Sequence, residues 1–173
     1  MNILIIPMIN YRFKEQIEYS LEKKLIIFLK RIFPKANIEV AITKNLSKKI
    51  NLLIFGGGNN ITLFSKKKED LLRNKIDNFF FKYALNKKIP IFGICHGAQF
   101  LAKKFGCKFN KSKHHVQNHY IEIIGNKSEK RKQLVNSYHN IIIVKKSKKI
   151  DIFAIADDNS IEAFCHKKLK IGG

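Results

Sequence analysis

Apolar residues along the first two thirds of the chain alternate between short continuous runs and sets with helical spacing. Short continuous runs are typical of buried strands, and they lie at residues 2–7, 38–42, 50–55 and 89–94. Helical spacing predicts helices at residues 13–33, 69–86 and 96–105. Strands that alternate with helices pair in parallel through crossovers. The nearly continuous apolar character of the strands indicates that both faces of the sheet are covered.

Helix ends and buried faces follow from the same pattern. Pro34 closes the first predicted helix and Gly106 the third. The predicted buried face of the second helix consists of five apolar or aromatic residues: Leu72, Ile76, Phe79, Phe80 and Tyr83.

The last third of the chain has a different rhythm, with short apolar runs and turn signals between them. These runs predict strands at residues 120–124, 141–145, 150–155, 160–164 and 169–171, with a turn at Asp157-Asp158-Asn159. The sequence therefore predicts a single α/β domain over residues 1–173. Its sheet is flavodoxin-like, doubly wound and mostly parallel, with an antiparallel extension in the C-terminal third. Ligands of such folds bind beyond the carboxyl ends of parallel strands, which directs attention to residues 56–59 and 95–97.

Composition narrows the class of protein. The chain has 173 residues, and 34 Lys+Arg against 13 Asp+Glu give a formal net charge of +21. With 45% hydrophobic residues it can bury a core, so disorder is excluded as the main description. An odd number of cysteines, three, does not make a disulfide framework, and no apolar run has the roughly 18 residues of a spanning helix. A cytoplasmic protein is predicted.

The positive charge suggests two interpretations. A large positive charge is typical of proteins that bind nucleic acid or anionic surfaces. Here the lysines are scattered in pairs along the whole chain, such as Lys87-Lys88 and Lys167-Lys168, and no nucleic-acid-binding motif accompanies them. A solvated surface together with AT-rich codon usage is the favoured interpretation, and no specific nucleic acid or membrane is predicted as a partner.

Candidate chemistry centres on Gly93-Ile94-Cys95-His96-Gly97, which follows a predicted strand and opens a predicted helix. This is the cysteine form of the nucleophile elbow, in which glycines two before and two after leave room for strand and helix to pass closely. A helix N-terminus lowers the pKa of a thiol, and the backbone N–H after the nucleophile faces the developing oxyanion. The alternative is a structural cysteine at a strand end with small neighbours.

The sequence resembles class I glutamine amidotransferases over nearly its whole length. The resemblance rests on four segments: Pro90-Ile91-Phe92-Gly93-Ile94-Cys95-His96-Gly97-Ala98-Gln99, Leu53-Ile54-Phe55-Gly56-Gly57-Gly58-Asn59, Val135-Asn136-Ser137-Tyr138-His139 and Asp158-Asn159-Ser160-Ile161-Glu162-Ala163. The last two resemble most the branch that hydrolyses γ-glutamyl amides such as γ-glutamyl-γ-aminobutyrate. The resemblance implies an amidohydrolase that needs no cofactor.

The resemblance also implies roles for individual residues. Cys95 would be the nucleophile that forms a γ-glutamyl thioester, and the N–H groups of His96 and of Gly57 or Gly58 would form the oxyanion hole. Five further residues would bind or face the substrate: Gln99, Ser137, Tyr138, His139 and His119. The partners implied are glutamine or a γ-glutamyl amide, and a synthetase or transferase that receives ammonia. The lysine-rich residues 65–70 suggest, from charge alone, a phosphorylated or nucleotide-linked substrate.

One departure from the family pattern is plain. The family completes its triad with a His-Pro-Glu segment, and this chain stops at Gly173 before such a segment. The 173-residue chain is therefore expected to be impaired in catalysis, with His139 the first substitute base to consider. A catalytically inactive relative that binds a partner or regulates it is the alternative function, and a basic nucleic-acid binder is a third.

His115 and His119, four residues apart with Cys107 upstream, raise the question of a metal site. Nothing at a standard spacing supplies the remaining ligands, so the sequence predicts no metal. Cys107 and Cys165 are interpreted as small packing residues.

Overall fold

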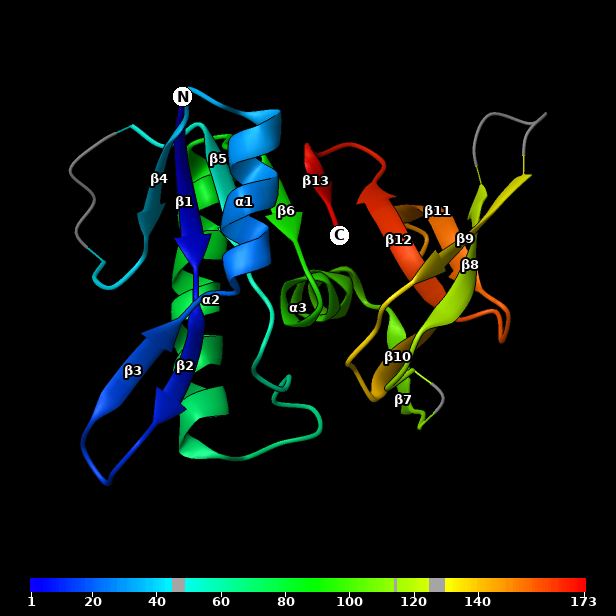
Figure 1. The fold of residues 1–173 in the computed structure, drawn as a ribbon, viewed down its shortest axis with the longest axis horizontal. Coiled ribbons are helices and arrows are strands. Elements are labelled where there is room, and N and C mark those ends of the chain that lie inside the picture. Colours follow the sequence, from blue (N-terminus) through cyan, green and yellow to red (C-terminus); the bar gives the residue numbers. More distant parts are fainter. Residues whose placement is uncertain (45–48, 114, 125–129) are drawn as a thin grey trace. The chain divides into compact units, whose positions relative to one another are not determined.

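The computed structural model describes the chain from Met1 to Gly173 except residues 45–48, 114 and 125–129. The described residues form two compact units, Met1–Ala98 and Gln99–Gly173. The first unit holds parallel strands and the second holds antiparallel strands (Figure 1). The interpretation of residues 1–173 as one domain stays a prediction.

The first unit is built on a parallel sheet of four strands. These are β1 (Asn2–Ile6), β4 (Asn37–Val40), β5 (Leu52–Phe55) and β6 (Ile91–Gly93). Pairing of β1 with β4 and β5, and of β5 with β6, gives the order β4-β1-β5-β6. Numbered along the chain as parallel strands, this order is 2-1-3-4, the beginning of the flavodoxin-like arrangement. The predicted parallel sheet is confirmed.

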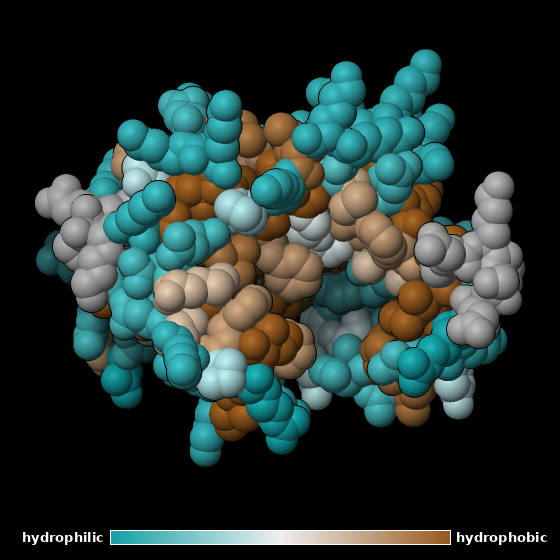
Figure 2. All heavy atoms as spheres, turned by 90° about the horizontal axis from the view of Figure 1, so that it is seen from above, coloured by the Kyte–Doolittle hydropathy of each residue, from teal (hydrophilic) through white to brown (hydrophobic). Residues whose placement is uncertain are grey.

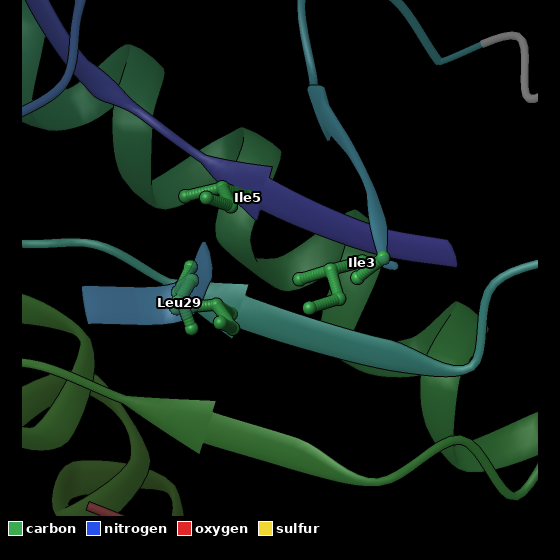
Figure 3. Close-up of a cluster of buried hydrophobic side chains, with 5 residues drawn as sticks. Ile3, Ile5 and Leu29 are labelled. Atoms are coloured by element: carbon green, nitrogen blue, oxygen red, sulfur yellow. The ribbon is translucent and has the colours of Figure 1, made fainter. Parts of the chain in front are cut away.

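Helices cover both faces of this sheet. Figure 1 shows α1 (Lys23–Ile32) on one face and α2 (Lys68–Asn86) on the other. Leu29 of α1 packs with Ile3 and Ile5 of β1, and Figure 3 shows their side chains turned toward one another. All three side chains are almost fully buried, and each such burial contributes roughly 1.5–3 kcal/mol of hydrophobic stabilisation.

The first predicted helix is wrong in its first half. Apolar spacing predicts a helix over residues 13–33, but α1 begins only at Lys23. Before it, β2 (Met8–Tyr11) and β3 (Ile17–Ser20) form an antiparallel hairpin. Phe13 and Ile17, which contribute to the helical period, are exposed. The hairpin is fixed from outside, because the side chain of Asn59 exchanges two 2.9 Å hydrogen bonds with the backbone of Ile9.

The second unit confirms the antiparallel part of the prediction. It contains seven described strands: β7 (Lys108–Lys111), β8 (His119–Ile124), β9 (Lys130–Val135), β10 (Ile141–Lys145), β11 (Ile150–Ala156), β12 (Ile161–His166) and β13 (Ile171–Gly172). Strands β9, β8, β11 and β12 pair in that order, and β12 also pairs with β10 and β13. Strands β7 and β9 were not predicted, because their lysine-rich sequences carry no apolar run.

Helix α3 (His96–Phe105) begins in the first unit and continues into the second from Gln99 onward. It ends as predicted at Gly106, whose φ of +89° is a left-handed conformation that glycine adopts without strain.

The lysine pairs lie on the surface. Residues 66–68, 87–88, 145–146 and 167–168 are exposed, and hydrophilic side chains extend outward over much of the face drawn in Figure 2. This exposure fits the solvated-surface interpretation of the positive charge. Among the helices described, none combines the length and apolar character needed to cross a membrane.

Candidate active site

Cys95 lies between β6 and α3 in a left-handed backbone conformation. Its φ is +53°, which is uncommon for a residue with a side chain and marks stored strain. The turn is fixed on both sides, since the N–H of Ile94 donates to the carbonyl of Phe55 and the N–H of Gly97 donates to that of Ile94, both at 2.9 Å. The thiol side chain is exposed. The predicted strand, sharp turn and helix around Cys95 are therefore present.

Two glycines make this turn possible through close approach. A Cβ on Gly97 would lie 2.1 Å from the carbonyl oxygen of Phe55, and one on Gly93 would lie 2.6 Å from the backbone N of Ala98. Both contacts are with backbone, which cannot move aside as the end of a side chain can. Any larger residue at either position would force β5, β6 and the start of α3 apart.

The glycine loop after β5 lies beside the thiol. A Cβ on Gly57 would be 3.2 Å from the Cβ of Cys95 and 3.7 Å from its Sγ. Bare backbone therefore faces the candidate nucleophile from the neighbouring strand end. The next residue, Gly58, has a φ of +109° and packs against Met8, where a side chain would collide.

A buried charged network underlies the loop and the elbow. Arg73 and Asp77 of α2 are both 0% exposed and form an ion pair, with Arg73 Nε 2.8 Å from Asp77 Oδ1. The other carboxylate oxygen of Asp77 lies 2.8 Å from Nε2 of His96, the residue after the candidate nucleophile. Nδ1 of His96 lies 2.9 Å from the carbonyl oxygen of Asn59. Since both neighbours of the ring are acceptors, hydrogens on both ring nitrogens satisfy this arrangement.

The same network holds the glycine loop in place. The Arg73 guanidinium donates to the carbonyl oxygens of Pro7 at 2.7 Å and of Gly56 at 2.8 Å. Asp70, one turn earlier on α2, accepts from the N–H of Asn60 at 2.9 Å. Three charged residues of α2 therefore fix the ends of β1 and β5.

This network corrects the predicted buried face of α2. Of the five residues expected to be buried, only Phe80 is fully buried, while Leu72, Ile76, Phe79 and Tyr83 are half-buried. The fully buried positions are Asp70, Arg73, Asp77, Phe80 and Ala84. An acidic and a basic residue four apart on the apolar side of a helix was the available signal.

Three of the predicted substrate-binding residues lie in the second unit with contacts of their own. Gln99 is buried and donates from Nε2 to the carbonyl oxygen of Ile141 at 2.9 Å. Ser137 is buried and donates from Oγ to the carbonyl oxygen of His115. Tyr138 is 82% exposed. Their roles toward a substrate remain predictions.

The other two, His119 and His139, belong to a histidine cluster around Glu162. Nε2 of each lies 3.7 Å from Oε2 of Glu162, and Nδ1 of His115 lies 3.3 Å from Oε1. Burial raises the pKa of the Glu162 carboxyl, but the hydrogen bond from His139 and the histidine charges outweigh it, so the pKa lies below its ordinary value.

A second carboxylate lies on the far side of His115. Nε2 of this ring is 2.9 Å from Oδ2 of Asp158. Burial raises the pKa of Asp158, but hydrogen bonds from Ser160 and His115 lower it more, to a net value of about 2. The sequence did not connect His115 with Glu162 or Asp158, because these residues meet only through strand pairing.

The remaining cysteines lie in the interior or near it. Cys107 is buried and Cys165 is half-buried. Burial raises the pKa of the Cys107 thiol, and the hydrogen bonds with Ser147 offset only part of that effect.

Known proteins show what the chain is similar to. Residues 12–173 match the family described as glutamine amidotransferase class-I. A γ-glutamyl-CDP-amidate hydrolase of Campylobacter jejuni is 34% identical over 128 residues, and the match covers 72% of this chain and 60% of that protein. The aligned part therefore spans less than two thirds of that relative's length.

Solved structures of low sequence identity share the fold. A putative GMP synthase component of Thermoplasma acidophilum has a TM-score of 0.73 at 20% identity, covering 99% of this chain and 81% of its own. A glutamine amidotransferase of Thermotoga maritima has a TM-score of 0.71 at 16% identity, covering 99% of this chain and 73% of its own. The family match, the identity with the hydrolase and the shared fold agree: the chain belongs to the class I glutamine amidotransferase family.

Proposed function

We propose that this chain carries the nucleophilic site of an amidohydrolase that cleaves γ-glutamyl amides. The observation that carries the proposal is the left-handed Cys95 at the start of α3, with the bare backbone of Gly57 packed against it. This is the arrangement that attack on a carbonyl carbon requires: an exposed nucleophile, a helix N-terminus that favours its thiolate, and backbone donors beside it.

The proposed reaction has two steps. The thiolate of Cys95 forms a bond to the γ-carbonyl carbon, and the C–N bond breaks as the leaving amine takes up a proton. Water then attacks the thioester, which releases glutamate and regenerates the thiol. The N–H groups of His96 and of Gly57 or Gly58 are the proposed donors to the oxyanion in both steps.

His96 is proposed as a positioning residue and not as the base. It is the only histidine among residues 1–98, but its ring is 1% exposed and both nitrogens face acceptors. The ring therefore has no free lone pair for the thiol proton. Its contacts with Asp77 and Asn59 instead tie the elbow to α2 and to the glycine loop.

The amine side of the substrate is proposed to carry a phosphate or nucleotide group. The name of the Campylobacter relative describes such a compound, a γ-glutamyl-CDP-amidate. In this chain, exposed lysines at residues 66–68 lie where the segment after the glycine loop enters α2, and the net charge is +21. Both features favour an anionic substrate. Faster hydrolysis of glutamine than of a nucleotide-linked γ-glutamyl amide would instead favour ammonia supply to a synthetase partner.

Thiol labelling tests the site directly. A glutamine-analogue electrophile is expected to modify Cys95 well ahead of Cys107 and Cys165, because Cys95 alone is exposed at a helix N-terminus. Cys107 is buried and its raised pKa leaves less thiolate at neutral pH. Peptide mapping by mass spectrometry over a time course gives the three rates. Iodoacetamide, which lacks the glutamyl group, serves as the control reagent, and equal labelling of all three thiols by the analogue would contradict the proposal.

Gly57→Ala tests the glycine loop. The new Cβ would press on Cys95 at 3.2 Å and displace the proposed oxyanion donor. Loss of one such donor lowers kcat by a factor on the order of 10² to 10³. Hydrolysis rates and Tm of the full-length protein measure the two effects separately.

Gly106→Ala is the matched control for that substitution. Gly106 has a φ of +89° and nothing within 4 Å of an added Cβ, so strain should lower stability by about 1–2 kcal/mol and leave kcat unchanged. If Gly57→Ala keeps full activity, the loop has no part in the oxyanion hole.

A further inference from the structure

The histidine cluster of the second unit draws residues from four separate places in the chain. His115 lies in the turn before β8, His119 begins β8, His139 lies between β9 and β10, and Glu162 lies on β12. One ligand atom from each of His115, His119 and Glu162 lies within 4.8 Å of the others. His139 adds a fourth nitrogen, 3.7 Å from Oε2 of Glu162. Side chains so far apart in sequence converge on one point inside the unit.

The outward ring nitrogens of the three histidines all face acceptors. Nε2 of His115 is 2.9 Å from Oδ2 of Asp158. Nδ1 of His139 is 3.1 Å from the carbonyl oxygen of Ile141, and Nδ1 of His119 is 3.4 Å from that of Gln117. An acceptor at one ring nitrogen holds the hydrogen there and leaves the lone pair on the other. Carboxylate and carbonyl partners of this kind are typical of histidines that bind metal ions.

The inward nitrogens lack hydrogen bonds. Nδ1 of His115 and Nε2 of His119 are buried without a hydrogen-bond partner among the described atoms, and His115 is only 3% exposed. Unpaired buried polar atoms are costly, and each one calls for an explanation. Here both face Glu162, whose side chain is 13% exposed. A cation between them would accept both lone pairs.

We propose that His115, His119, His139 and Glu162 bind a divalent transition-metal ion of the zinc type. Three imidazole nitrogens and one carboxylate oxygen suit Zn²⁺, whereas Mg²⁺ and Ca²⁺ prefer oxygen ligands. Around a tetrahedral zinc ion with bonds of about 2.0–2.1 Å, ligand atoms lie about 3.3 Å apart. The separations of 3.3 and 3.7 Å to the Glu162 oxygens are close to this value.

Four protein ligands make a closed site of the structural type. The ion would fasten the turn at His115 and the segment at His139 to β12, and would thereby stabilise the second unit. This site is independent of the thiol chemistry proposed for Cys95.

Zinc binding to the full-length protein, freed of metal by a chelator and with its thiols alkylated, tests the proposal. Titration calorimetry is expected to give one Zn²⁺ per chain, and Co²⁺ in its place should show the visible absorption of a four-coordinate site. Saturating Zn²⁺ should raise Tm by several degrees, since binding to the folded state alone stabilises it. Mg²⁺ should have neither effect.

Variants decide whether these residues are the ligands. His119→Ala and Glu162→Gln should each weaken Zn²⁺ binding by roughly 100-fold or more, and Asp158→Asn, which alters only the partner of His115, by about 10-fold. His166→Gln is the control, because this histidine lies outside the cluster and accepts from the N–H groups of Lys168 and Leu169. Absence of binding to the unaltered chain, or equal affinity in all variants, overturns the proposal. If Glu162→Gln does not fold, His119→Ala and Asp158→Asn still decide.

Discussion

Replacing Cys95 with alanine is expected to lower γ-glutamyl amide hydrolysis by the full-length protein by a factor of roughly 10⁴ to 10⁶. Without the thiol no thioester forms, and only the backbone donors around the elbow remain to assist direct attack by water. Single-turnover and steady-state kinetics on a γ-glutamyl amide measure the loss. The substitution should leave Tm nearly unchanged, because the Cys95 side chain is exposed and alanine retains the same backbone strain.

The matched controls for this prediction are the other two cysteines. Cys165→Ala should keep full activity, and Cys107→Ala should lose some stability, because that side chain is buried, while keeping its kcat. Cys95→Ser preserves the shape of the side chain but supplies a poorer nucleophile, so it should resemble the alanine variant. A Cys95→Ala protein that retained a tenth of the original activity would show that another group is the nucleophile. The family fold would then carry a different site.

The elbow was predictable because its constraints are local. Gly93 and Gly97 are needed at fixed distances from Cys95, and the structure shows why, in backbone contacts that a Cβ would close to 2.1–2.6 Å. The parallel strands were predictable for a similar reason, since each is a buried apolar run. Features of this kind leave a signature within about ten residues.

The parts that were missed depend on partners far away in the chain. Arg73 and Asp77 are buried because the carbonyls of Pro7 and Gly56 and the ring of His96 pair with them. Helical spacing alone assigns that face to apolar residues. The hairpin of β2 and β3 depends on Asn59, which is 50 residues from Ile9. Periodicity along the chain contains no information on such contacts.

The histidine cluster shows the same limit from the other side. Standard ligand spacing did not complete a metal site around His115 and His119, since Glu162 lies more than 40 residues along the chain. The antiparallel strands bring it to 3.3 Å from His115. Ligand motifs detect sites made by one or two neighbouring segments, and this cluster is assembled by the sheet.

The buried network under the elbow gives the second large prediction. Asp77→Ala is expected to lower the free energy of unfolding by about 3–5 kcal/mol, because it leaves the Arg73 guanidinium, 0% exposed, without its counter-charge. It also removes the partner of His96 Nε2, which lies 2.8 Å away. Such a loss is a large part of the roughly 5–15 kcal/mol that stabilises a typical domain. Urea unfolding monitored by circular dichroism measures it.

A surface ion pair of the same chain provides the comparison. Arg12 and Glu18 lie 3.2 Å apart, but their side chains are 64% and 42% exposed. Glu18→Ala should therefore lower stability by less than about 1 kcal/mol. Asp77→Asn separates charge from shape: it keeps an acceptor for one partner only, so its stability should fall between those of the unaltered protein and Asp77→Ala. In Asp77→Asn kcat should fall at temperatures where the variant is fully folded, because His96 positions the elbow through this contact. Equal stability losses for Asp77→Ala and Glu18→Ala would mean that the Arg73–Asp77 pair is open to water in solution, and His96 could then not be held by it.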